Sequence, residues 1–301
     1  MTEPAEQESR VQLGSHERPP GLALHPLLRA PLFLLVGLLL LILVNSLAAG
    51  AAPGMPAATR SPLWYALAVT GLLGESWVFL RVFEGRSYRA LGVWFFPGWG
   101  RELAIGAAIG AALLGIVGAT LAAAHAVVFR GLAGGALPGV LRLGGWMFLA
   151  AAFEEILFRG YLFQQLLSRA GPIPAVTLFS GLFALAHLGN PSATPLSTLN
   201  TFLSGVLLSV AYWKTRALWL PIGLHWSWNF CMGPLLSLPV SGIELSPTLL
   251  RVERAGAQWL TGGAYGPEGG AAVAMVCLAA TLWLARTRRV SPSLAAAEAV
   301  K

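Results

Sequence analysis

Long apolar stretches, separated by short polar segments, dominate the pattern of the chain. Crossing a hydrocarbon core of ~30 Å takes about 20 helical residues, and about eight stretches come near or exceed that length. The pattern therefore predicts an all-α, polytopic membrane protein with about eight transmembrane helices. The predicted spans cover residues 30–50, 62–80, 102–128, 143–167, 173–188, 195–213, 217–236 and 269–285. Helix starts and breaks are predicted at Pro172, Pro174, Pro191, Pro195 and Pro221.

The same pattern divides the chain into five parts. Three N-terminal transmembrane helices occupy residues 30–142, and a core of four helices occupies residues 143–236. A last transmembrane helix and a cytoplasmic tail make up residues 269–301. A polar N-terminal tail, residues 1–29, is expected in the cytoplasm. An external loop, residues 237–268, contains several glycines, so we expect it to pack loosely.

Composition supports the membrane class, because charge is scarce. Only 11% of the residues are charged and 56% are hydrophobic, whereas soluble domains carry about 25% charged residues. Such a chain cannot cover a water-facing surface, so the composition favours a membrane protein over a soluble one. The chain contains 35 glycines, and small residues let helix backbones approach each other in lipid. Gly106, Gly110 and Gly118 in the third span predict a close-packing face of this kind.

The net charge of +7 is also consistent with a membrane protein. In a soluble protein it would suggest nucleic-acid binding, but here the basic residues stand at the ends of apolar runs. We therefore expect the lipid bilayer as a partner and no nucleic acid. Basic loops stay in the cytoplasm, which places both termini there, and the Lys-poor composition favours a bacterial inner membrane. The opposite side receives only Arg60, Arg130, Arg142, Arg251 and Arg254.

Three ionisable residues lie inside the fourth span, namely Glu154, Glu155 and Arg159. A charge at mid-bilayer costs roughly 2.5–3.5 kcal/mol on insertion scales, so such residues are functional candidates. Glu155 and Arg159 are four positions apart and are expected to pair on one helix face. Glu154 points about 100° away and can serve as a general base for a water. The alternative, a buried ion pair that only fixes helix packing, explains the second glutamate poorly.

Two later spans carry polar groups of their own. His225 and Asn229 are four positions apart in the seventh span and could hold an oxyanion or orient a substrate carbonyl. His187 ends the fifth span. A lone histidine at the end of a helix is as often a capping residue as a functional one. Polar groups on three separate spans together favour one shared site. Cys231 and Cys277 have no metal-ligand spacing and are predicted to be packing residues.

The successive motifs Glu154-Glu155-xxx-Arg159, Phe183-xxx-His187 and His225-xxx-Asn229 resemble those of a known family. They are similar to the CAAX protease and bacteriocin-processing family of intramembrane proteases, also called CPBP or Abi, which is related to type II CAAX prenyl endopeptidases. The resemblance covers about residues 143–232. It implies a catalytic four-helix core that hydrolyses a peptide bond in a membrane-anchored protein or peptide.

The resemblance also implies roles for the site residues. Glu154 would activate the water with His187, while His225 and Asn229 would bind the developing oxyanion. Glu155 and Arg159 would support that geometry. We favour this metal-free, glutamate-type mechanism without a cofactor. Two histidines and a glutamate can also form a zinc site, and the spacing does not decide between the two, because the chain has no HExxH motif.

Two functions of other classes use the same kinds of residue. A proton-coupled transporter also needs intramembrane Glu, Arg and His, but it predicts inverted repeats, and none is visible in the sequence. A non-catalytic membrane scaffold or immunity protein could retain all the motifs. A protease predicts that Glu154→Ala abolishes function while the fold stays intact, whereas a scaffold predicts no effect.

Overall fold

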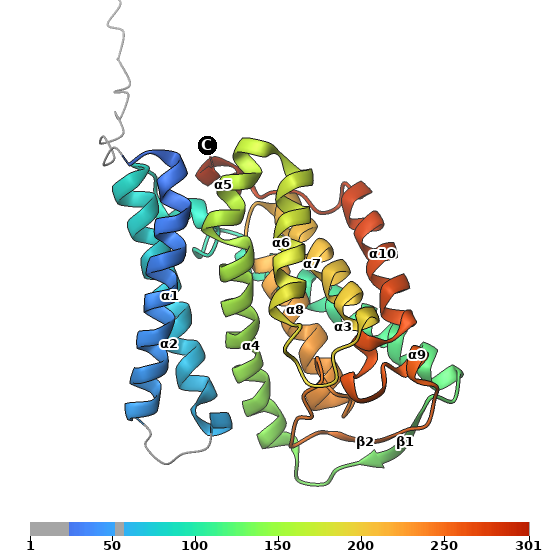
Figure 1. The fold of residues 1–301 in the computed structure, drawn as a ribbon. Helices are drawn as coiled ribbons and strands as arrows, with labels where there is room; N and C mark the ends of the chain where they lie inside the picture. Colours follow the sequence, from blue (N-terminus) through green and yellow to red (C-terminus); the bar gives the residue numbers. More distant parts are fainter. Residues whose placement is uncertain (1–23, 52–56, 301) are drawn as a thin grey trace, which may run out of the picture.

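Helices arranged side by side make up most of the molecule (Figure 1). The computed structural model describes residues 24–51 and 57–300, so most of the predicted N-terminal tail lies outside the described residues. The chain is a multi-span membrane protein, because several of its helices are long and apolar enough to cross a bilayer. These candidate spans are Leu28–Ala51, Ser61–Phe83, Trp99–Ala123 and Pro195–Thr215.

The first two helices form a pair that stands beside α4 (Figure 1). They are α1 (Pro26–Ala51) and α2 (Ala57–Val78). Aromatic rings join this pair to the rest of the molecule. Phe33 stacks on Tyr161 with ring centroids 4.7 Å apart. The outer face of α1 is a row of exposed apolar side chains, as expected for a surface in contact with lipid: Leu34, Leu35, Leu38, Leu39, Ile42 and Leu43.

The predicted four-helix core contains α4 (Leu137–Arg159), α6 (Pro172–Ala186), α7 (Pro195–Thr215) and α8 (Trp219–Phe230). Prolines begin α6 and α7, as predicted, because the first turn of a helix does not use the missing backbone N–H. Thr194 and the first turn of α7 also form a capping box. These starts fix where the later site residues fall along each helix.

The fourth predicted span, 143–167, is not one helix. α4 ends at Arg159, and a separate helix, α5 (Tyr161–Ala170), begins after Gly160. A Cβ atom at Gly160 would lie 2.0 Å from the carbonyl oxygen of Ile156, so the chain can turn here only because this residue is glycine. The prediction of an uninterrupted span was therefore wrong, because one glycine leaves no trace in an apolar pattern.

α3 (Trp99–Ala123) packs closely against α8, as its glycines predicted. Added Cβ atoms at Gly106 and Gly110 would lie 2.1 and 2.3 Å from carbonyl oxygens of α8. In return, a Cβ atom at Gly223 of α8 would lie 2.2 Å from a carbonyl oxygen of α3. Gly118 has only an ordinary contact at 3.5 Å, so two of the three predicted positions form the tight contact.

A short β ladder lies outside the bundle and was not predicted. α3 ends at Ala123, not at 128, and is followed by β1 (Val127–Leu132), which pairs antiparallel with β2 (Leu250–Arg254). Arg130 and Glu253 form an ion pair across the ladder at 2.8 Å, although they are 123 positions apart. A pairing over such a distance cannot be read from a local apolar pattern. The all-α class thus describes the bundle, to which the ladder is an addition.

The segment that leads from α8 to α10 (Ala271–Arg286) is packed at both ends, so the loose packing expected for it holds only for its middle, where residues 253–259 are exposed. Leu238 and Tyr265 are only 4% and 1% exposed. The backbone N–H of Gly242 donates to the carbonyl oxygen of Tyr265 at 2.8 Å, which ties the two ends of the segment together. It contains a π-helical turn (Cys231–Leu235), α9 (Gln258–Thr261) and two 3-10 turns, Gly263–Tyr265 and Pro267–Gly269; α11 (Leu294–Val300) follows α10.

Candidate active site

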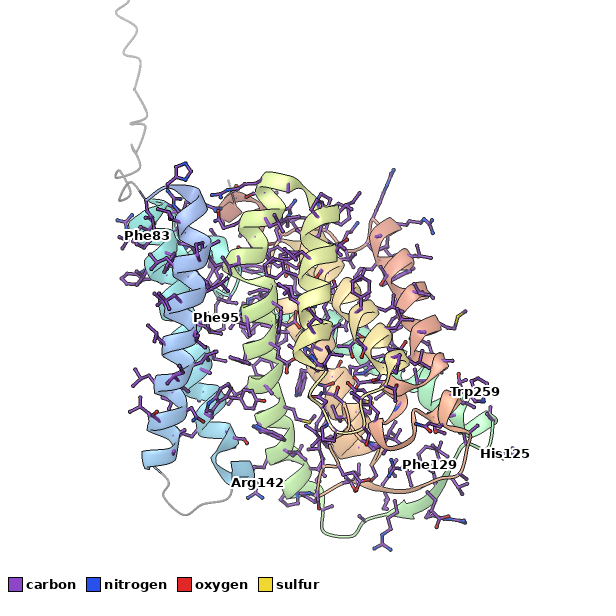
Figure 2. All side chains as sticks on the ribbon, in the orientation of Figure 1. Phe83, Phe95, His125, Phe129, Arg142 and Trp259 are labelled. Atoms are coloured by element: carbon purple, nitrogen blue, oxygen red, sulfur yellow. The ribbon has the colours of Figure 1, made fainter. Side chains whose placement is uncertain are left out.

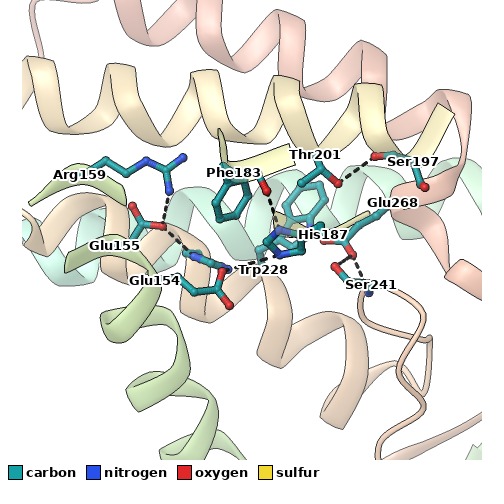
Figure 3. Close-up of polar contacts among 11 residues, drawn as sticks. Glu154, Glu155, Arg159, Phe183, His187, Ser197, Thr201, Trp228, Ser241 and Glu268 are labelled. Carbon is teal, nitrogen blue, oxygen red and sulfur yellow. Dashed lines mark hydrogen bonds and ion pairs between the residues drawn. The ribbon is translucent and has the colours of Figure 1, made fainter. Parts of the chain in front are cut away.

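Polar side chains from three helices meet inside the bundle (Figure 3). The last turns of α4 and the C-terminal ends of α6 and α8 supply them. The structure therefore brings the three predicted motifs to one place. The residues are Glu154, Glu155 and Arg159 of α4, His187 at the end of α6, and His225 and Asn229 of α8.

Glu155 and Arg159 form the predicted ion pair. Nη1 of Arg159 lies 3.1 Å from Oε1 of Glu155, and both side chains are fully buried. Arg159 also donates to the carbonyl oxygen of Gly205 at 3.0 Å and to Oγ of Ser209 at 3.3 Å, both on α7. Its guanidinium lies over the ring of Phe183, 4.6 Å from the ring centroid. The pair thus fixes α4 against α6 and α7.

His225 is oriented by the same carboxylate. Its Nδ1 lies 2.8 Å from Oε1 of Glu155. Because Glu155 is paired with a guanidinium, it accepts hydrogen bonds, and Nδ1 of His225 donates. Nε2 is then the nitrogen that is free for chemistry. It faces Glu154, at 3.7 Å from Oε2.

His187 presents the same ring nitrogen from the opposite side. Its Nδ1 lies 2.8 Å from the carbonyl oxygen of Phe183. A carbonyl oxygen can only accept, so Nδ1 donates here as well. Nε2 of His187 lies 3.9 Å from Oε2 of Glu154. Each histidine therefore has a fixed ring orientation with Nε2 turned toward one carboxylate oxygen.

Glu154 differs from its neighbour in its surroundings. Its side chain is 24% exposed, whereas that of Glu155 is fully buried. The distances of 3.7 and 3.9 Å to the two histidines are too long for direct hydrogen bonds. Separations of this size between polar groups are typical of places where a water can bridge. Glu154, His187, His225 and Asn229 all line one cavity of about 260 Å³.

One family model matches the chain, over residues 136–231, and its description is Type II CAAX prenyl endopeptidase Rce1-like. The chain thus contains an Rce1-like type II CAAX prenyl endopeptidase domain. No curated protein and no solved structure matches the chain. All six predicted site residues fall within the Rce1-like domain. The family assignment agrees with the resemblance of the motifs.

Part of the cavity wall lies outside the Rce1-like domain. Glu268, just before α10, lines the cavity together with Ser241. Its Oε1 accepts a hydrogen bond from Nε1 of Trp228 at 3.1 Å, and its Oε2 accepts from the backbone N–H and Oγ of Ser241 at 2.8 and 2.7 Å (Figure 3). Glu268 was not predicted as a site residue, because no spacing links it to the motifs.

The donor set also bears on the zinc alternative. Among the described residues, no three His, Cys, Asp or Glu side chains are arranged so that they could hold a metal ion. Nδ1 of His225 is already engaged with Glu155, so only Nε2 could serve as a ligand. The described residues of the Rce1-like domain thus form no preformed three-ligand zinc site.

Proposed function

We propose that this protein is an intramembrane endopeptidase that hydrolyses a peptide bond in a membrane-associated protein or peptide. One observation carries the proposal: a partly exposed carboxylate, Glu154, faces Nε2 of both His187 and His225 within one cavity. The Rce1-like domain supports the same reaction class. The catalytic type that we favour is glutamate-dependent.

In the proposed mechanism, a water occupies the space between Glu154 and the two histidines. Glu154 removes a proton from this water. The resulting hydroxide adds to the carbonyl carbon of the substrate, and the C–N bond then breaks. The proton held by Glu154 passes to the leaving amide nitrogen, so that one water is consumed for each bond cleaved. His187 accepts a hydrogen bond from the water through Nε2 and orients it.

The developing oxyanion needs donors on the opposite side of the carbonyl. Asn229 lines the cavity one helical turn after His225, and its amide group can donate. His225 donates as well when Nε2 carries a proton. Glu155 and Arg159 act as positioning residues, since they touch His225 and α7 but do not line the cavity.

We further propose an eight-span topology with both termini in the cytoplasm, in a bacterial inner membrane. The catalytic core then comprises residues 143–236, slightly longer at its end than the matched domain. In support of this topology, a helix coincides with each of the eight predicted spans: α1, α2, α3, α4, α6, α7, α8 and α10.

Cleavage of membrane-anchored peptides by the purified protein tests the proposal. Wild type, Glu154→Ala and His225→Ala are compared with and without a strong chelator. Glu75→Gln is the matched control, because Glu75 is a buried glutamate of α2 that does not line the cavity. We expect cleavage by wild type and Glu75→Gln, no cleavage by the other two, and no effect of the chelator.

The remaining outcomes discriminate the alternatives. Inhibition by the chelator, reversed by zinc, would make the protein a metalloprotease. If Glu154→Ala cleaved as well as wild type, Glu154 would not be the general base. If wild type cleaved no peptide and Glu154→Ala kept its effect in cells, the protein would be a non-catalytic scaffold.

A further inference from the structure

The cavity reaches toward one end of the bundle only. On each helix that lines it, the lining residues lie toward that end, and none comes from the last turn at the opposite end. On α8 the lining begins at Leu224, on α10 it is Cys277, and on α4 it ends at Glu154, before Arg159. On α7 the lining residues all lie in the N-terminal two thirds of the helix: Thr201, Ser204, Leu207 and Leu208.

Connecting segments at that end complete the wall. Asn190 follows α6, and Glu268 precedes α10. β1, β2 and α9 lie at the same end, opposite the C-terminus (Figure 1). Figure 2 shows Phe129 and Trp259 at this end and Phe83 at the other. Between α8 and α10 the lining residues are Val240, Ser241, Ile243, Leu245 and Glu268, and we call the segment 237–270 the cap.

The opposite end is closed by packing. Arg159 and Glu155 are fully buried and bonded to each other. Beyond them, Tyr212 and Leu218 are 1% and 0% exposed, and Phe163 is 0% exposed. These layers close the cavity at this end, and its lining residues lie toward the cap.

The distribution of basic residues indicates which end of the bundle is cytoplasmic. The closed end holds the larger number: Arg29, Arg81, Arg86, Arg89, Arg101, Arg169, Lys214, Arg216, Arg286, Arg288 and Arg289. The cap end holds Arg60, Arg130, Arg142, Arg251 and Arg254. Two of the latter are paired with carboxylates, Arg130 with Glu253 at 2.8 Å and Arg254 with Glu244 at 2.7 Å. Segments rich in Lys and Arg stay on the cytoplasmic side, so the closed end is cytoplasmic.

We infer that the cavity opens to the extracytoplasmic face, beneath the cap. This inference rests on the proposed peptidase function for its substrate class. The substrates are exported proteins that keep a transmembrane anchor, and the bond that is cut lies in the outer half of that anchor or just outside it. The hydroxide derived from water adds to the carbonyl carbon, and the leaving amide nitrogen takes the other proton of that water as the C–N bond breaks. The exported part is then released from the anchor that remains in the membrane.

Cysteine labelling in the full-length protein tests the orientation. Ala257 in the cap and Ala170 at the end of α5 are both exposed alanines, so Ala257→Cys and Ala170→Cys form a matched pair. Each variant is treated with a charged maleimide that does not cross membranes, in spheroplasts and in inside-out vesicles. Wild type gives the background from Cys231 and Cys277.

We expect Ala257→Cys to be labelled in spheroplasts and Ala170→Cys only in inside-out vesicles. The reverse pattern, or labelling of both positions from the same side, would overturn the orientation. Neither position lines the cavity, and labelling does not require cleavage. The orientation is therefore decided even if the peptidase proposal fails.

The substrate class is tested with single-span peptides reconstituted with wild type, whose products are mapped by mass spectrometry. Cuts in the cap-side half of the span support the inference. Cuts in the other half would overturn it and leave the peptidase proposal standing. If no peptide were cut, the peptidase proposal and the substrate class would both fail.

Discussion

His225 and Glu155 are joined by a contact of 2.8 Å from Nδ1 to Oε1, and Arg159 holds the same oxygen at 3.1 Å. A single buried carboxylate oxygen thus links a candidate catalytic ring to a guanidinium. The three side chains act as one unit. Removal of any one of them changes the environment of the other two.

Arg159→Met should destabilise the protein strongly, because Glu155 would be left as a buried carboxylate without its cation. Breaking one partner of a buried pair costs about 3–5 kcal/mol. Thermal unfolding in detergent should show a large fall in Tm. The double variant Glu155→Gln with Arg159→Met should recover part of this loss. Equal Tm values for the single and double variants would contradict the prediction.

Glu154→Gln and Glu155→Gln should have different effects on kcat and Tm. Glu154 makes no direct hydrogen bond to the histidines and is partly exposed, so its amide variant should keep the wild-type Tm. Its kcat should fall by roughly 10²–10⁴, which is the usual contribution of a general base. Glu155→Gln should lower both kcat and Tm, since it disturbs Arg159 and His225. A lower Tm for Glu154→Gln would argue for a structural role.

Gly110→Ala should force α3 away from α8. The added Cβ atom would lie 2.3 Å from a carbonyl oxygen and 2.2 Å from Oγ of Ser227, and overpacking of this kind costs about 1–3 kcal/mol. Because α8 carries His225, kcat should fall as well. Gly115→Ala is the matched control, as nothing lies within 4 Å of its added atom. If both variants unfolded at the same temperature, the close contact would not matter for stability.

Glu268→Gln should loosen the cap. A glutamine cannot accept hydrogen bonds with both terminal atoms, so either Trp228 or Ser241 loses its acceptor. We expect faster hydrogen exchange in residues 237–245 and a higher KM, with a smaller change in kcat. Glu244→Gln, an exposed carboxylate of the same segment, should change neither quantity. Unchanged exchange in Glu268→Gln would show that the cap does not depend on these bonds.

The pairing of β1 with β2 should weaken at low pH. The hydrogen bond from Arg130, together with its charge, holds the pKa of Glu253 below its ordinary value. Because the folded-state pKa is lowered, the stabilisation is present above the ordinary value of about 4.3 and is lost as the pH falls through the lowered value. Amide protection in β1 and β2 should fall over that window. Arg130→Gln should remove this pH dependence, and its persistence would contradict the assignment.

Sequence patterns predicted the contacts within one helix of the site better than the contacts between helices. The pairing of Glu155 with Arg159 follows from helix geometry alone, since residues four positions apart share a face. The meeting of His187 and His225 around Glu154 depends on how three helices pack. Polar groups on three spans favoured one shared site, but the arrangement within that site was indicated only by the family resemblance. The roles of these residues and the metal-free mechanism remain predictions.

Other features could not be predicted from spacing or hydropathy. Gly160 ends α4 through a backbone turn that does not alter the apolar run. Glu268 reaches Trp228 across 40 positions of chain, and its neighbours in sequence are glycines and a proline without a motif. Contacts between distant loop segments depend on the tertiary fold. The part of the cavity outside the matched domain therefore became visible only in three dimensions.

The length of α6 has a consequence for the surrounding lipid. α6 has 15 residues, which at ~1.5 Å per residue is about 22 Å, shorter than a hydrocarbon core of ~30 Å. Leu178, Leu182 and Leu185 of α6 are exposed, as expected for side chains in contact with lipid. The bilayer must thin beside α6, or water must enter to meet the chain after His187. Membrane thickness should therefore affect the hydration of the site. Short acyl chains should favour the entry of water, and long acyl chains should oppose it.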